Sequence, residues 1–144
     1  MDVSLKIKLI EDSNHFKEFI KNNPHYYIVH IFKLLDDKTS KNNWQIGYYS
    51  KDTDRIVVFD YNEGIITVNE PEEALKEDNY IQKLDFNNIK ISSDKALEIS
   101  QELLEKEYKG EFPTKHIFLL QNLPEHGNIW NITIVTMTFS VINI

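Results

Sequence analysis

A block of sequence that recurs at a fixed distance is the feature that most limits how this chain can fold. Residues 30–46 match residues 116–132 without a gap, and Trp follows His by fourteen positions in both blocks. The shared positions are His30/His116, Ile31/Ile117, Phe32/Phe118, Leu34/Leu120, Asn42/Asn128, Trp44/Trp130 and Ile46/Ile132. Such a match predicts two related halves, residues 1–80 and 81–144, that share one compact core. The alternative is chance similarity between apolar strands.

Length and composition favour one soluble domain. A chain of 144 residues can bury about two-thirds of its unfolded surface. The chain has no cysteine, which excludes disulfides and thiolate metal sites. Its start lacks the basic and apolar runs of a signal peptide, and no stretch approaches the roughly 20 apolar residues of a membrane span. We therefore expect a cytoplasmic protein with no membrane partner.

The charge pattern argues against nucleic acid as a partner. The formal net charge is −7, and no cluster of Lys and Arg is long enough to follow a phosphate backbone. Acidic residues near the segment 94–107 fit the solvated side of a helix better than a docking surface. Asp52, Asp54, Asp60, Asn62 and Glu63 lack the contiguous spacing of a calcium loop. We expect no metal and no cofactor.

In the first half, the residue patterns predict a helix and an antiparallel meander. Alternating apolar residues predict a strand over 3–9, and Asp12-Ser13 predicts the start of a helix that ends before Pro24. Further strands are expected over 26–35, 44–49, 55–61 and 65–68, with turn residues between the last three. Asn69 and Pro71 predict a short helix through Lys76.

In the second half, a short strand over 89–91 is expected to precede the best helix of the chain. Ser92-Ser93-Asp94 supplies its cap, and its apolar residues recur at spacings of three and four. Strands follow over 116–121 and from 129 onward. The segment 136–140 lacks Gly, Pro, Asn and Asp, so either an unusual turn or one long bent strand lies there.

The two halves resemble PepSY-type units, each a helix followed by an antiparallel meander. The resemblance rests on the capped helix start 93–99, on the aromatic-led strand 130–134 and on the closing Asp and Gly of the hairpin 58–66. The second half departs from it, because no such Asp and Gly follow Ile142-Asn143-Ile144. The chain also lacks the export signal of many members. The resemblance implies a binding or regulatory module without catalytic activity.

Two matched pairs of residues are the candidates for a site. If His30 and His116 lay near one axis, two imidazoles would suit zinc or proton transfer. The alternative is that both are structural, because each opens an apolar strand and no His-Glu-x-x-His motif or nucleophile elbow is present. Trp44 and Trp130 are candidates for lining a pocket, or else they belong to the core. We assign no catalytic and no metal-binding residue.

These observations predict an α+β fold, with helices on one face of an antiparallel sheet. The favoured function is a non-enzymatic binding or regulatory module that engages a peptide or protein through a sheet face or edge. One alternative is a small-molecule or metal-dependent enzyme with a cavity between helix and sheet. Another is a homodimer through Phe139–Ile144, because an uncharged apolar edge favours pairing.

Overall fold

The computed structural model describes residues 3–36, 41–62, 64–73, 81–85, 88–138 and 140–144. The helices of this part are α1 (Val3–Glu11), α2 (Asn14–Asn22) and α3 (Ser93–Glu107). The strands are β1 (Tyr27–Asp36), β2 (Lys41–Ser50), β3 (Arg55–Asn62), β4 (Ile65–Val68), β5 (Glu72–Glu73), β6 (Pro113–Leu123), β7 (Gly127–Thr136) and β8 (Val141–Asn143).

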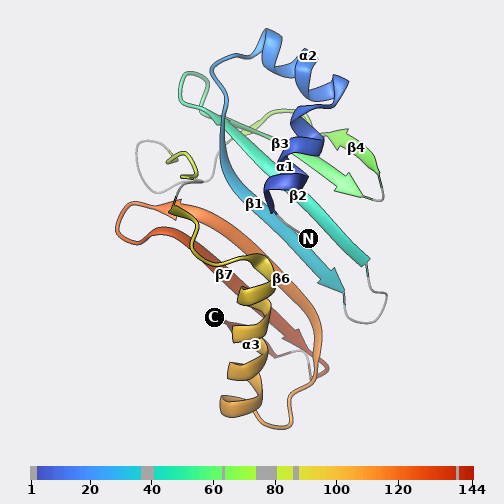
Figure 1. Ribbon diagram of the computed structural model, residues 1–144, viewed down its shortest axis with the longest axis vertical. Helices are drawn as coiled ribbons and strands as arrows, with labels where there is room; N and C mark the ends of the chain where they lie inside the picture. Colours follow the sequence, from blue (N-terminus) through green and yellow to red (C-terminus); the bar gives the residue numbers. More distant parts are fainter. Residues whose placement is uncertain (1–2, 37–40, 63, 74–80, 86–87, 139) are drawn as a thin grey trace.

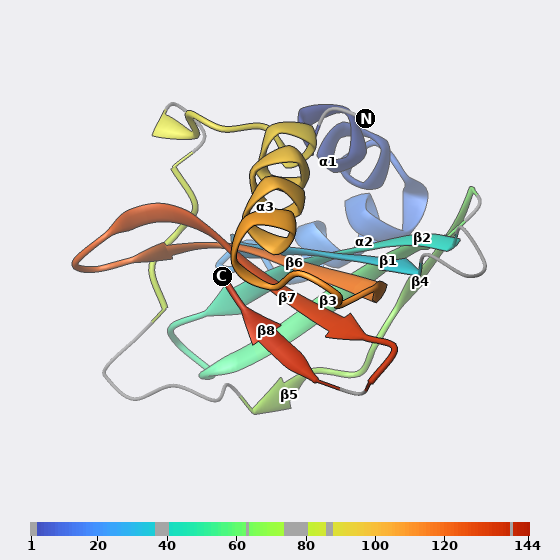
Figure 2. The same cartoon turned by 90° about the horizontal axis from the view of Figure 1, so that it is seen from below.

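All strands belong to one antiparallel sheet with the order β4-β3-β2-β1-β6-β7-β8, and β5 pairs with β3 beside β4. The central pair, β1 and β6, joins the two predicted halves (Figure 1). The three helices lie on the same side of the sheet (Figure 2). The predicted α+β class with an antiparallel sheet is therefore confirmed. We call the side under the helices the covered face and the other side the open face.

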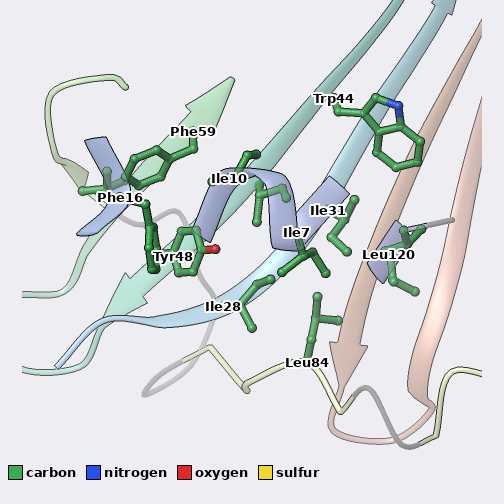
Figure 3. Close-up of a cluster of buried hydrophobic side chains, with 13 residues drawn as sticks. Ile7, Ile10, Phe16, Ile28, Ile31, Trp44, Tyr48, Phe59, Leu84 and Leu120 are labelled. Atoms are coloured by element: carbon green, nitrogen blue, oxygen red, sulfur yellow. The ribbon is translucent and has the colours of Figure 1, made fainter. Parts of the chain in front are cut away.

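The covered face under α1 and α2 is filled by aromatic and branched side chains. The rings of Phe16, Tyr48 and Phe59 lie 5.0–5.6 Å apart from centroid to centroid (Figure 3). Ile31 and Ile46 of the neighbouring strands are fully buried beside them. Leu84 and Leu120, from the second half of the sequence, belong to the same cluster. Side chains from both halves thus form this core.

A second, smaller cluster lies under α3. It contains Ala96 and Leu104 of the helix, packed on Phe118, Ile134 and other strand residues. The helix begins as expected, because the Ser92 hydroxyl accepts a hydrogen bond from the Lys95 backbone N–H at 3.1 Å. Among the described residues, no helix is long and apolar enough to cross a membrane.

The first segment of the chain is a helix, so the strand predicted over 3–9 is wrong. Val3, Ile7 and Ile10 are buried, at the spacing of one helix face, whereas Leu5 and Leu9 are exposed. The apolar residues of this segment alternate as in a strand, but Val3, Ile7 and Ile10 also have the spacing of one helix face. The predicted second helix is confirmed, with Ser13 as the cap of α2.

Three further local predictions are decided by the structure. Glu72–Glu73 forms strand β5 rather than a helix, because its backbone pairs with β3, while residues 74–76 of that prediction lie outside the described part. Residues 89–91 form no strand. Between β7 and β8 lies a turn, in which the Thr136 hydroxyl contacts the hydroxyl of Thr138 at 3.1 Å. Hydroxyl side chains there take the place of the usual turn residues.

Candidate functional site

The first strands of the two matched blocks are out of phase in the sheet. Ile31 is fully buried on the covered face, whereas its match Ile117 is half-buried on the open face. The hairpin pairing shows the cause, since Ile46 lies opposite Ile31 but Ile132 lies opposite Phe118. A slip of one residue turns every side chain to the other face. Matched residues of β1 and β6 therefore point to opposite faces of the sheet and have different surroundings.

The slip separates the two candidate histidines. His116 is 1% exposed and stacks beside Phe118 on the covered face. His30 follows a bulge in β1 and lies next to Ile31, so its side chain is on the open face. Along the central pair, His30 faces Gln121 and His116 faces Leu35. The structure does not bring the two imidazoles together.

His30 lies over the backbone of β2. Its partner across the strands is Gly47, and a Cβ at Gly47 would overlap the imidazole ring. Glycine is therefore needed there to make room for the histidine. Burial lowers the pKa of His30 to about 4, so the ring is neutral at pH 7.

Trp44 belongs to the core. It is 1% exposed, and the Lys33 ammonium lies 5.0 Å from its ring centroid and 5.5 Å from that of Phe118. Burial lowers the pKa of Lys33, although the nearby Asp94 carboxylate opposes that shift. These contacts give Trp44 a structural role at the junction of the two clusters.

Trp130 is half-buried and lines a cavity between α3, the tip of the β6–β7 hairpin and the residues before α3. The cavity has a volume of about 640 Å³. Its apolar lining consists of Ile89, Ile91, Ala96, Ile99, Leu120, Ile129, Trp130, Ile132 and Ile144. Polar lining residues are Asp85, Asn88, Lys90, Asn122, His126, Gly127 and Asn128. A cavity of this size lies in the range of about 300–1,000 Å³ that ligand sites occupy.

The described residues 81–85 and 88–91 are here called the connecting segment, and Asp85 with residues 88–91 forms one wall of the cavity. Asn128 binds it twice, because its amide N–H donates to the Asp85 carbonyl at 2.7 Å and its amide oxygen accepts from the Asp85 N–H at 3.2 Å. Asn122 donates to the Lys83 carbonyl at 2.8 Å, and the Trp130 indole N–H donates to the Ile91 carbonyl at 2.8 Å. Three side chains of the hairpin thus hold the wall in place.

The surface of the cavity is mainly apolar. Its inner lining, with Ala96, Leu120 and Ile132, offers apolar contact. Within the part of the chain that the structure describes, no group of three His, Cys, Asp or Glu residues has the arrangement of a metal site. Of the four sequence-predicted residues, only Trp130 lines this cavity.

Asn122 and Asn128, which fix the cavity wall together with Trp130, were not predicted as site residues. Asn128 carried a signal, because it is one of the matched positions of the two blocks, but its hydrogen bonds join residues 43 positions apart. No local spacing encodes such a contact. Comparisons with protein-family models, with curated proteins and with solved structures find no match for this chain.

Proposed function

We propose that this protein is a non-catalytic binding module that takes up an apolar side chain of a peptide or protein partner in the cavity beside α3. The observation that carries the proposal is the cavity itself, which has a volume of about 640 Å³ and is lined by mostly apolar residues. Apolar pockets with a few polar groups at the rim are the usual form of a ligand site.

Three polar groups of the cavity are already used within the chain, which favours binding through shape rather than through catalysis. The amides of Asn122 and Asn128 and the indole N–H of Trp130 are engaged with the connecting segment. The mainly apolar lining offers a ligand burial of apolar surface, which stabilises a complex by about 25 cal/mol per Å² before the costs of association. A leucine-sized or phenylalanine-sized anchor suits such a site.

The likeness to PepSY-type units agrees with a non-catalytic role, and membership of that family is part of the proposal. The alternative of a small-molecule site or enzyme uses the same cavity between helix and sheet. The two readings differ in the occupant, so one set of variants can separate them.

Selection of peptides from a random displayed library tests the proposal. We expect enriched peptides to carry an apolar anchor and to shift the methyl NMR signals of Ile99, Ile129 and Ile132. The variant Ile99→Glu places a charge at the cavity, where Ile99 is 41% exposed, and should weaken binding by about tenfold or more. Ile65→Glu, at an exposed residue of β4, is the matched control and should bind normally.

The outcomes separate the hypotheses. Peptides that bind Ile99→Glu as tightly as the unmodified chain would contradict the proposed site. A native mass spectrum that shows a retained small molecule, lost in Ile99→Glu but not in Ile65→Glu, would favour the small-molecule alternative. Failure to enrich any peptide that shifts the cavity methyl signals would count against a peptide-binding role.

A further inference from the structure

The two edges of the sheet differ in how they are protected against pairing. The edge formed by β4 and β5 carries Glu70, Pro71, Glu72 and Glu73 in sequence, and β5 itself consists of two exposed glutamates. Charges and proline are the usual means by which an edge strand avoids a second strand. The opposite edge, β8, consists of Val141, Ile142 and Asn143 and carries no charge. Only β4–β5 has these protective residues.

The backbone of β8 presents hydrogen-bonding groups to solvent in a defined order. The Thr136 N–H donates to Ser140, and Ile144 exchanges two hydrogen bonds with Ile132, at 2.9 and 2.7 Å. In an antiparallel ladder the hydrogen-bonded positions alternate, so the even-numbered residues of β8 face β7. The N–H and C=O groups of Val141 and Asn143 therefore point away from the sheet.

The side chains around this edge are also apolar and exposed. Val141 is 67% exposed and Met137, in the turn before β8, is 61% exposed. Phe112 is 64% exposed, and its carbonyl accepts the Met137 N–H at 2.8 Å. Exposed apolar residues next to an unpaired backbone mark a surface suited to association.

We propose that β8 pairs antiparallel with β8 of a second copy of this chain, with the twofold axis at Ile142. In this register Val141 of each copy lies opposite Asn143 of the other copy, which gives two such pairs. Each of these pairs joins residues whose backbone groups point outward, so four intermolecular hydrogen bonds form. This inference is independent of the function proposed for the cavity.

A second copy fits this edge because the edge is complementary to itself. The outward-pointing residues, Val141 and Asn143, lie one on each side of Ile142, so a twofold axis at Ile142 matches every donor with an acceptor. No charge of β8 is placed against its copy, and the net charge of −7 of each chain acts only over a longer distance. Because salt screens that repulsion, the dimer should be tighter at higher ionic strength.

Proline substitution tests the pairing without changing the inner ladder. Asn143→Pro removes an N–H that points away from β7, and the symmetry doubles the loss to two hydrogen bonds per dimer. Sedimentation equilibrium over a concentration series should show a dimer for the unmodified chain and about 30-fold weaker association for Asn143→Pro. The matched control is Val68→Pro on β4, whose N–H also points outward, because Asn69 bonds to Val58. It should dimerise normally.

A cross-link tests the register. Residues opposite each other at a non-hydrogen-bonded position have Cα atoms about 4.5 Å apart, within disulfide range. Ile142→Cys, the only cysteine in that variant, should therefore form a covalent dimer on oxidation. The control Val68→Cys should not. An unmodified chain that stays monomeric at all concentrations, or an Asn143→Pro variant that is folded and dimerises normally, would overturn the proposal.

Discussion

Residues that match between the two sequence blocks lie in different environments. Trp44 and Ile46 of the first block are almost fully buried in a filled core, whereas Trp130 and Ile132 of the second block line the cavity beside α3. The histidines differ more, because the slip between the hairpins places them on opposite faces. Identical residues at a fixed sequence offset therefore do not form equivalent sites. A shift of one residue in the strand pairing is enough to place them on opposite faces.

The largest expected difference between the blocks concerns the matched isoleucines. Ile46→Ala should lower the free energy of unfolding by about 4 kcal/mol, because Ile46 is fully buried among packed side chains. Ile132→Ala should cost about 2 kcal/mol, because part of its side chain already faces the cavity. Urea denaturation of both variants measures the difference. Equal losses would mean that the two clusters are packed equally well.

The pH dependence of the free energy of unfolding should follow the protonation of His30. The pKa of His30 is about 4 in the folded chain and about 6.5 when unfolded, so the unfolded chain binds its proton first as the pH falls. Its stability contribution is complete above pH 6.5 and is lost between pH 6.5 and 4, by up to about 3 kcal/mol. Urea midpoints over this range should fall less for His30→Gln. An unchanged pH profile in that variant would contradict the burial of the neutral ring.

The matched asparagine of the second block is expected to stabilise the cavity wall. Asn128→Ala removes two hydrogen bonds to Asp85 and should cost about 1–2 kcal/mol. Amide hydrogen exchange should become faster in the connecting segment, while the amides of β2 and β3 should keep their protection. Asn69→Ala, at an exposed residue after β4, is a control with little expected effect. Unchanged exchange in the connecting segment would show that other contacts hold the wall.

The smallest expected effect on stability comes from filling the cavity. Ala96→Leu adds apolar volume at a buried position of α3 that lines the cavity, and should change stability by less than about 1 kcal/mol. The same variant should lose peptide binding, because the added side chain occupies the site. Isothermal titration with a selected peptide, and a melting curve, measure both effects. Undiminished binding would place the peptide outside the cavity.

The elements with local signals were predictable from the sequence. The Ser13 and Ser92 caps marked the starts of α2 and α3, and the polar turn around Gly64 marked the hairpin of β3 and β4. Helix α1 was not, because Val3 and Ile7 fit both a strand and a helix pattern. The period of the pattern could not decide between them.

The candidate site was predictable only in part. Trp130 was singled out from the matched blocks, but its cavity exists because Asp85 and residues 88–91 approach the hairpin near Asn128, far away in the sequence. His30 and His116 do match in the sequence, but their side chains lie on opposite faces of the sheet. Alignment without a gap could not reveal a bulge in β1 or the different lengths of the two hairpin connections.

The connecting segment has a consequence for how the chain unfolds. Ile81 packs with Val29 and Tyr49 on the open face, while Leu84, three residues later, is buried on the covered face and its N–H donates to the Ile28 carbonyl at 3.0 Å. The segment therefore passes around the end of β1 and is fixed on both sides of it. The two halves cannot separate while these contacts persist. Limited proteolysis and thermal unfolding should therefore show a single cooperative unit rather than two.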